Sequence, residues 1–371
     1  MNRNRVNKKR MGRARVLSRA AAGMLAAALC FQPMTALAGP AGDSSLTSSS
    51  SNAGPGGGSG SSNSGSTGSS GGSTAVSNGS VSAVTSGLGV YRVTENEGIG
   101  AIARGVDVSY WQQNVNWSQV SSDNVQFAML ATRFRGNVDP FFAMNAANAS
   151  QAGLRLGAYI YSYATSVEMA QQEADFVLNL IKDYPISFPV VFDAEDANTL
   201  GTLTQSQVSD VINAFCKRIQ DAGYYPMVYA NEYWIANKID MSKISYDIWV
   251  AKYQQKYTYS KTSMWQASNT GSVKGVNGNV DIDYLYKDYT QIIPGNTWRT
   301  IAGNRYYYQN HVMQKAAWIN DGQNWYYMNA AGNPSKGWLE LSGKKYYLEA
   351  DGHMITGWKK LDGGWGYFLA S

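Results

Sequence analysis

Three carboxylates stand together at the end of an apolar run in the sequence VVFDAEDANT, residues 190–199. The run predicts a buried strand that ends at Asp193, with Glu195 and Asp196 directly after it. Residues i and i+2 of a strand point to the same side, roughly 7 Å apart, so Asp193 and Glu195 can enter one site. Mutual repulsion and an apolar wall raise carboxyl pKa values. One carboxyl can then stay protonated as a general acid while another stays ionised, as glycosidic bond cleavage requires.

Further carboxylates lie in two distant segments that also read as strands. Asp107 lies in GVDVS, and Asp281 and Asp283 lie in VDIDYL. In a β/α barrel the catalytic groups gather at the C-terminal ends of the strands, and the first and last strands are neighbours. We therefore predict that Asp107, Asp193, Glu195 and an acid of the last strand, Asp281 or Asp283, form one catalytic site. The alternative is that these acids make salt bridges and helix caps.

The residue inventory excludes several other chemistries. The only histidines, His311 and His353, lie near the C-terminus. A Ser–His–Asp or Cys–His hydrolase and a His-ligated zinc site in the middle of the chain are therefore excluded. No GxxxxGK phosphate-binding loop occurs. A metal site at Asp193 and Glu195 is a weaker alternative, and we expect neither a metal nor another cofactor.

Alternating strand and helix patterns between residues 99 and 290 would position these acids. The apolar strands and intervening helices predict an α/β fold, a compact, irregular and incomplete β/α barrel of the TIM type with a helix-covered parallel sheet. An open doubly wound sheet is the alternative. The clearest helix spans 204–222, where Thr204 and Gln207 form a capping box. The expected strands are 105–109, 127–131, 156–162, 189–193, 226–230, 247–251, 263–266 and 280–285.

The first 98 residues read as a leader and a linker. Residues 1–38 hold eight Lys and Arg, an apolar stretch and a small-residue cleavage pattern, which predict a secretory signal peptide. Residues 39–98 are rich in Ser and Gly and predict a disordered linker. Without the leader, 23 bases stand against 26 acids, so nucleic-acid binding is not expected. No other segment is apolar enough to span a membrane.

Residues 297–371 carry an aromatic repeat. Trp318, Trp338 and Trp358 are spaced by 20, with Gly-containing turns between aromatic clusters. This period predicts an array of stacked β-hairpins. Exposed rings there can form a cation–π cage, for which the candidates are Trp318, Trp325, Trp338, Tyr346, Trp358 and Trp365. The alternative is that these rings only pack the hairpins together.

Residues 104–286 resemble the family-25 glycoside hydrolases, lysozymes that cut peptidoglycan between N-acetylmuramic acid and N-acetylglucosamine. The resemblance rests on motifs in the family's order. These are GVDVSYWQQNVNW (105–117), DPFFAMNAANASQAGLRLGAYIYSYA (139–164), FPVVFDAED (188–196), GYYPMVYAN (223–231), DIWVAKY (247–253), MWQAS (264–268) and GNVDIDYL (278–285). It implies a short, irregular β/α barrel.

The resemblance also implies roles for the acids. Glu195 matches the general acid, and Asp193 matches its partner, which stabilises the charged intermediate or orients the acetamido group. Asp107 and Asp281 match acids that line the site. The second step is left open between a carboxylate nucleophile and the substrate's own N-acetyl group. Sugar-binding candidates in or beside the strands are Tyr161, Tyr163, Tyr229, Trp249, Tyr253, Trp265 and Gln266.

The chain departs from the family pattern at two places that bear on the site. FAMLATRFRG has Ala131 where the family often has arginine, with Arg133 and Arg135 displaced, and Asp283 stands where asparagine is common. The C-terminal repeats resemble the choline-binding repeats of secreted wall proteins, which implies binding to choline or another wall polymer. We therefore expect a secreted, cell-wall-associated muramidase. The alternative is a non-catalytic wall adhesin with a decayed barrel.

Overall fold

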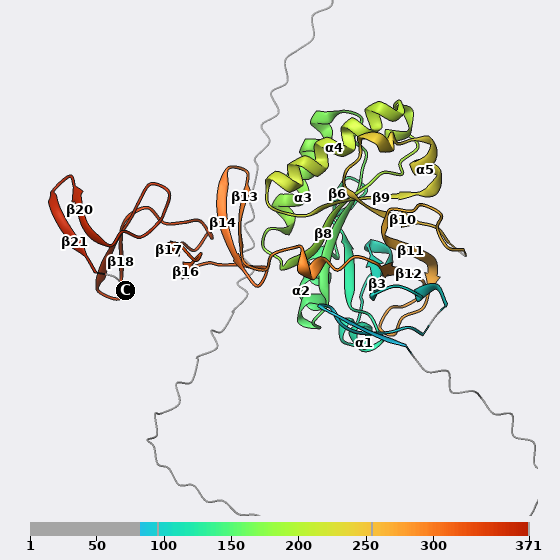
Figure 1. The fold of residues 1–371 in the computed structure, drawn as a ribbon, viewed down its shortest axis with the longest axis horizontal. Coiled ribbons are helices and arrows are strands. Elements are labelled where there is room, and N and C mark those ends of the chain that lie inside the picture. Colours follow the sequence, from blue (N-terminus) through green and yellow to red (C-terminus); the bar gives the residue numbers. More distant parts are fainter. Residues whose placement is uncertain (1–81, 95, 254, 370–371) are drawn as a thin grey trace, which may run out of the picture. The chain divides into compact units, whose positions relative to one another are not determined.

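The computed structural model describes residues 82–94, 96–253 and 255–369. Its central feature is a closed barrel of strands in the order β10-β11-β12-β3-β4-β7-β8-β9 (Figure 1). The barrel strands are β3 (Ala103–Val108), β4 (Phe127–Ala131), β7 (Arg155–Tyr161), β8 (Ile186–Asp193), β9 (Pro226–Asn231), β10 (Asp247–Ala251), β11 (Thr262–Gly271) and β12 (Val280–Leu285). The predicted barrel is confirmed, and the open doubly wound sheet is excluded.

The barrel is not wholly parallel, which corrects the predicted parallel sheet. Strand β12 runs antiparallel to both of its neighbours, β11 and β3. The reason is the connection, since residues 272–279 contain no helix and a parallel return needs a crossover of about a dozen residues or more. The start of β12 therefore lies at the same edge of the barrel as the ends of the parallel strands.

Helices cover the outer face of the barrel. They are α1 (Trp117–Ser122), α2 (Phe142–Gln151), α3 (Val167–Ile181), α4 (Gln205–Asp221) and α5 (Glu232–Asn237). Short 3-10 helices are η1 (Asn96–Gly98), η2 (Tyr110–Gln112), η3 (Leu200–Thr202), η4 (Met241–Lys243) and η5 (Tyr289–Gln291). Helix α4 confirms the predicted helix, because Thr204 and Gln207 form its capping box and its apolar stripe is buried. None of the helices in the described ranges is long and apolar enough to cross a membrane.

Alternate residues of the strands fill the barrel interior. Phe127, Met129 and Val191 belong to the inner cluster, whereas Ala128 and Val190 belong to the cluster between strands and helices. This period of two is the pleat of the strand. Each fully buried large side chain of this kind contributes about 1.5–3 kcal/mol by transfer from water. Because the same alternation continues to the strand ends, it decides which polar side chains face inward there.

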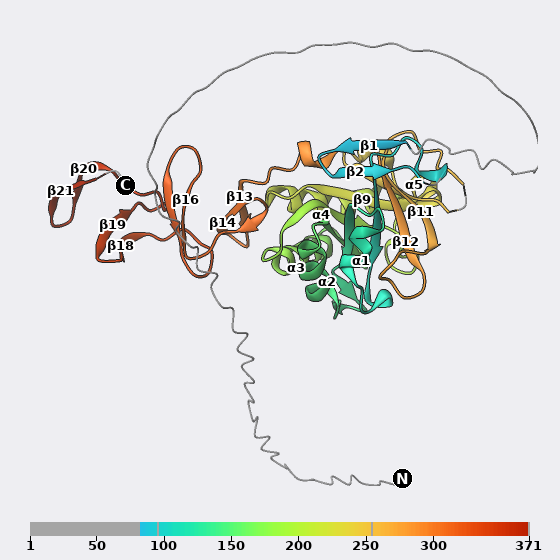
Figure 2. The same ribbon diagram turned by 90° about the horizontal axis from the view of Figure 1, so that it is seen from below.

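A hairpin precedes the barrel inside the range expected to be linker. Strands β1 (Ala83–Ser86) and β2 (Gly89–Arg92) pair antiparallel, and Tyr91 is buried. The Arg92 N–H donates to Asn124 Oδ1 at 3.0 Å, which joins the hairpin to the barrel (Figure 2). Apolar residues in this stretch bury enough surface to order it, so the structured chain begins before residue 99. The expected signal peptide and residues 39–81 lie outside the described residues.

The aromatic repeats form antiparallel hairpins, as predicted. Their strands are β13 (Thr297–Ile301), β14 (Asn304–Gln309) and β15 (Val312–Met313), β16 (Ala317–Asn320) and β17 (Trp325–Met328), β18 (Gly337–Leu341) and β19 (Lys344–Leu348), and β20 (Gly357–Leu361) and β21 (Gly364–Phe368). Each hairpin has a tryptophan on its first strand that lies opposite a tyrosine on its second strand. The pairs are Trp298 with Tyr307, Trp318 with Tyr327, Trp338 with Tyr347 and Trp358 with Tyr367.

The first hairpin is joined to the outside of the barrel. Arg299 is 2% exposed, and its guanidinium lies 3.9 Å from the ring centroid of Tyr224 and 4.2 Å from that of Tyr308. The Tyr308 hydroxyl donates to the carbonyl of Lys182 at 2.8 Å. A desolvated cation between two rings is a strong form of the cation–π contact. This hairpin therefore packs as part of the barrel's outer layer.

Candidate active site

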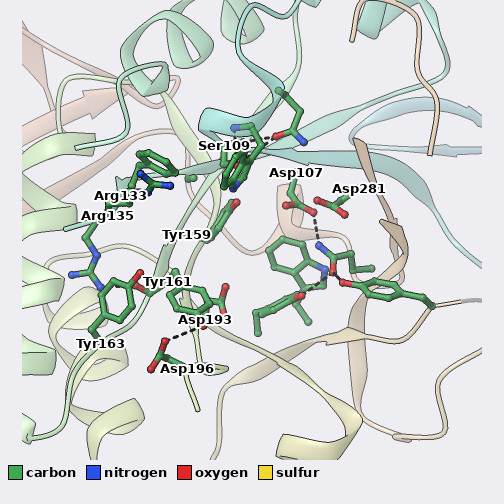
Figure 3. A pocket seen from close by; sticks show the side chains of 18 residues that line it. Asp107, Ser109, Arg133, Arg135, Tyr159, Tyr161, Tyr163, Asp193, Asp196 and Asp281 are labelled. Atoms are coloured by element: carbon green, nitrogen blue, oxygen red, sulfur yellow. Dashed lines mark hydrogen bonds between the residues drawn. The ribbon is translucent and has the colours of Figure 1, made fainter. Parts of the chain in front are cut away.

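A cleft of about 470 Å³ opens where the barrel strands end, and three acids from distant strands line it. Asp107 comes from β3, Asp193 from the end of β8 and Asp281 from the start of β12 (Figure 3). Asp281 pairs directly with Asp107 in the ladder between β12 and β3. The antiparallel direction of β12 therefore brings its first residues, not its last, to the cleft.

Asp107 and Asp281 share one side of the cleft with a deeper acid, Asp283 (Figure 3 shows the first two). Burial raises the pKa of Asp107, and the charges of Asp281 and Asp283 raise it further. Asp283 is 0% exposed and accepts the Trp249 Nε1–H at 3.0 Å. Burial likewise raises the pKa of Asp283. Because a charge on one of these acids raises the pKa of its neighbours, the three acids titrate as a coupled group.

Asp193 faces the cleft without a local partner. It is 7% exposed, and no hydrogen bond from a described residue reaches its Oδ1. Burial raises its pKa, and the charges of Glu195 and Asp196 add to the effect. A buried polar atom that lacks a partner is costly to the fold. The Asp193 side chain lines the cleft, although Oδ1 itself is shielded from solvent.

Glu195 follows the same strand end but is not among the side chains that line the cleft. It is half-buried, and its Oε1 accepts the Asn231 N–H at 2.6 Å. Burial raises its pKa, even though the bonds from Asn231 act in the opposite direction. After burial itself, the charge of Glu195 is the largest influence that raises the pKa of Tyr229, which lines the cleft. The carboxyl of Glu195 is therefore close enough to Tyr229 for its charge to act on the wall of the cleft.

Gln266 joins two tyrosines to Asp107. The hydroxyls of Tyr229 and Tyr253 donate to Gln266 Oε1 at 2.8 and 2.7 Å. Gln266 Nε2 in turn donates to Asp107 Oδ2 at 2.7 Å. Two donors on the oxygen leave only the nitrogen for Asp107, so the network sets the amide orientation. The bond to the ionised form lowers the pKa of Asp107 in part.

Six of the predicted sugar-binding residues line the cleft, and one does not. Those that line it are Tyr161, Tyr163, Tyr229, Trp249, Tyr253 and Gln266. The prediction for Trp265 was wrong, because it is 1% exposed and belongs to the cluster outside the barrel strands. Its Nε1–H donates to the carbonyl of Lys252. Since neighbours on a strand face opposite sides, the inward position of Gln266 turns Trp265 outward.

The cleft also holds residues that the sequence did not single out as site residues. Asp196 accepts hydrogen bonds from Tyr161 Oη at 3.2 Å and from Thr199 N at 2.7 Å, and such bonds lower its pKa. Its place in the acidic cluster DAED was the available signal. Trp111 was visible only as an aromatic after the first strand. Ala131, Arg133 and Arg135 had been noted only as departures from the family pattern, and Tyr159 is one of the aromatics of the strands. The other unpredicted lining residues are Ser109, Gln112 and Phe134.

The aromatic residues predicted to bind a wall ligand occupy different settings. The Trp318 ring centroid lies 4.9 Å from that of Tyr346 in the next hairpin. Trp338 contacts Phe368 at 5.8 Å, and Trp358 contacts only its own hairpin partner, Tyr367, among the described rings. Large parts of four of these tryptophans are exposed, namely Trp325, Trp338, Trp358 and Trp365. Exposed rings in this number are available to a ligand.

Comparison with known proteins identifies both parts of the chain. The profile of glycosyl hydrolases family 25 matches residues 106–276, and that of the cell wall binding repeat matches 317–333 and 336–354. The protein YegX of Escherichia coli O157:H7, described as uncharacterized, is 31% identical over 189 residues, covering 48% of this chain and 68% of YegX. The chain belongs to glycosyl hydrolase family 25.

Two other similar proteins carry the name lysozyme. Lysozyme M1 of Streptomyces globisporus is 30% identical over 195 residues, which cover 48% of this chain and 66% of that protein. A crystal structure of a bacterial lysozyme from Streptomyces coelicolor is 25% identical, covers 52% of this chain and 95% of its own, and has a TM-score of 0.42. This family-25 chain is a glycoside hydrolase that carries cell wall binding repeats.

Within the described ranges, no group of three or more His, Cys, Asp or Glu side chains is arranged to hold a metal ion. Asp107, Asp281 and Asp283 come together from two strands, but their contacts are to Gln266 and Trp249. The chemistry that the family-25 cleft offers is proton transfer and charge stabilisation by carboxyls.

We expect the titration of Asp281 to make stability depend on pH. Burial raises its pKa to about 6, so the folded state binds this proton more tightly than the unfolded state. The stability that it contributes is present at low pH and is lost as the pH rises through about 6. Asp281→Asn removes this titration. Between about pH 4.5 and pH 7.5 the wild-type free energy of unfolding should fall by on the order of 1–2 kcal/mol more than that of the variant.

Thermal unfolding followed by circular dichroism at both pH values measures this difference. The charge of Asp281 also raises the pKa of Asp107 and Asp283, so the difference between the two proteins measures Asp281 together with its effect on these two acids. Parallel pH dependences of the two proteins would contradict the assignment.

Proposed function

We propose that this chain is an exported muramidase, which hydrolyses the β-1,4 bond between N-acetylmuramic acid and N-acetylglucosamine in peptidoglycan. The observation that carries the proposal is the convergence of Asp107, Asp193 and Asp281 on one aromatic-lined cleft, with Glu195 beside it. The lysozyme relatives support the substrate class. The leader-like composition of residues 1–38 supports export.

Glu195 supplies the proton in the proposed reaction. Burial raises the pKa of Glu195, which favours the protonated carboxyl that a general acid needs. It gives this proton to the glycosidic oxygen, so the bond between that oxygen and C1 breaks and the N-acetylglucosamine side leaves as an alcohol. A water molecule then supplies the hydroxyl to C1 of N-acetylmuramic acid and returns a proton to the site. A turn of the Glu195 side chain away from the Asn231 N–H brings the acid to the bond.

Asp193 opposes the positive charge that develops at C1. Its carboxyl, which lines the cleft, can accept the N–H of the substrate's acetamido group or lie against the oxocarbenium ion. Asp107 is held by Gln266, which is itself held by Tyr229 and Tyr253. This chain of hydrogen bonds gives the opposite wall of the cleft one orientation before substrate arrives, which is the preorganisation that electrostatic catalysis needs.

The repeats hold the enzyme at the wall through the later hairpins. In the first hairpin, the guanidinium of Arg305 lies 4.1 Å from the ring centroid of Trp298, so the chain's own cation covers that ring. Trp338 and Trp358, by contrast, are 61% and 69% exposed. Choline or another group of a wall polymer is the proposed ligand of these rings.

The second candidate function is a non-catalytic wall adhesin. The retained acids at 107, 193, 195 and 281 favour catalysis, because an unused site has no reason to keep buried carboxyls that cost stability. Digestion of purified peptidoglycan followed by borohydride reduction separates the two functions. A muramidase produces reduced muramic acid, whereas a glucosaminidase produces reduced glucosamine. Absence of any new reducing ends would support the adhesin.

A further inference from the structure

A two-stranded hairpin forms part of the cleft rim and presents an arginine at its tip. Strands β5 (Arg133–Phe134) and β6 (Asn137–Val138) pair antiparallel, with Phe134 opposite Asn137. The turn residues Arg135 and Gly136 have φ of 48° and 81°. Both positive values are those of a type I′ turn, in which Asn or Gly is preferred at the first position. The hairpin thus carries an arginine at a position where its backbone conformation is unfavourable.

The guanidinium of Arg135 is free, in contrast to that of its neighbour. Arg133 forms an ion pair with Glu173 at 2.7 Å and donates to the carbonyl of Tyr161, so its charge is compensated. Arg135 lines the same cleft but makes no ion pair or side-chain hydrogen bond with a described residue. Its Cζ lies 5.0 Å from the ring centroid of Phe134. The positive charge of Arg135 therefore has no ion-pair partner among the described residues, and the contact with Phe134 helps to hold the guanidinium at the cleft.

A flat aromatic platform lies beside this cation. The Phe134 ring stacks on that of Tyr110, with centroids 4.1 Å apart and planes at 16°. Trp111 packs its edge at 5.7 Å from Phe134 and is 67% exposed while lining the cleft. A broad exposed ring of this kind suits the face of a sugar. Ring and guanidinium together fit a sugar unit that carries a negative group.

The charges of the cleft are arranged with opposite signs on its two sides. Figure 3 shows Arg133 and Arg135 on one side and Asp107 and Asp281 on the other, with Asp193 and Asp196 between them. The carboxylates of the cleft repel an anionic substituent of the substrate, and Arg135 attracts it. Such complementarity fixes the direction and register in which a charged chain binds.

We propose that Arg135, with Trp111 and Phe134, forms a subsite for an anionic substituent of the glycan, a carboxylate or a phosphate. The proposal rests on the proposed muramidase function. Two sources in cell walls share this chemistry, namely the carboxylates of the peptides attached to muramic acid and the phosphodiesters of polymers attached to the glycan. In both cases the Arg135 guanidinium pairs with the anion through two parallel N–H donors.

The test compares Arg135→Gln and Arg135→Lys with wild type on three substrates. These are intact walls, walls freed of phosphodiester polymers by hydrofluoric acid, and glycan chains freed of peptides by an amidase, with the lactyl carboxylates that the amidase exposes then converted to amides. Arg92→Gln is the matched control, because it removes an exposed charge that does not line the cleft. We expect Arg135→Gln to lower kcat/KM on intact walls by about 10-fold or more, since a charge-assisted hydrogen bond is lost. Arg135→Lys should restore part of it.

The two sources of the anion are distinguished by the treatment that abolishes the difference in kcat/KM between wild type and Arg135→Gln. Loss of the difference on peptide-free glycan assigns the carboxylate, and its loss after hydrofluoric acid assigns the phosphate. An equal effect on all three substrates, or an effect no larger than that of Arg92→Gln, overturns the proposal. Release of reducing ends from the three substrates by the wild type tests the muramidase function separately, so the two failures are distinguishable.

Discussion

Glu195→Gln should abolish nearly all hydrolysis of purified peptidoglycan, with a fall in kcat of about 10³-fold or more, within the range typical of a lost general acid. Glutamine keeps the size of the side chain, and its carbonyl oxygen can still accept the Asn231 N–H. The fold is therefore expected to survive the change. What is lost is the proton that the leaving oxygen needs. Release of reducing ends over time, at equal enzyme concentration, measures the effect.

Asp196→Asn is the matched control for this variant. It removes one negative charge from the same DAED segment, and the Asn Oδ1 can still accept the bonds from Thr199 and Asn198. Hydrogen bonds lower the pKa of Asp196, so it stays ionised and cannot act as the acid. We expect its activity to stay within about tenfold of wild type, because the general acid is retained. Comparable activities of Glu195→Gln and wild type would refute the assignment of Glu195.

Asp193→Asn should lower the activity of the protein and raise its stability. Activity should fall by about 10²- to 10³-fold, because the buried carboxylate that opposes the developing charge is gone. Stability near neutral pH should rise. Burial and the charges of Glu195 and Asp196 raise the pKa of Asp193, so the stability linked to its proton is lost as the pH rises. An amide removes that cost, as expected where function and stability compete.

Asp139→Asn provides the contrast for the stability measurement. Asp139 is 2% exposed, against 7% for Asp193. Both of its oxygens are used, since Oδ2 accepts the Tyr110 N–H at 2.7 Å and Oδ1 accepts the Phe141 N–H at 2.9 Å. An amide there would direct an N–H₂ group at a backbone donor, so its melting temperature should fall. If Asp193→Asn is destabilised as much as Asp139→Asn, Asp193 has a structural role rather than the proposed catalytic one.

The pattern of apolar and polar residues within each segment was sufficient to predict several strands and one helix of the barrel. The strands at 127–131, 247–251 and 280–285 were predicted with the bounds that the structure has, and helix α4 differs by one residue at each end. These segments are apolar, regular in period and bounded by caps or turns, so neighbours in sequence decide their conformation. Residues 83–92 were harder, because their few apolar side chains become ordered only on contact with the barrel.

The direction of β12, and which side chains of the adjacent strand β11 point into the barrel, depended on the tertiary structure of the whole barrel. The acid at 281 enters the cleft because the start of β12 pairs with Asp107, a relation that no local pattern contains. Trp265 and Gln266 are both plausible sugar contacts as residue types. Only the ladder register between β11 and β12 turns Gln266 toward Asp107 and Trp265 outward.

The sequence by itself determined the chemistry of this protein, since histidine is absent from the barrel and carboxylates end or begin its apolar strands. It also determined the hairpin repeats through their fixed period. Only the tertiary structure decided which acids influence each other's titration, that Arg133 is paired with Glu173 while Arg135 has no ion pair with a described residue, and that Arg299 joins the first hairpin to the barrel. The physical reason is that charge coupling, burial and pairing depend on distances between segments far apart in the chain.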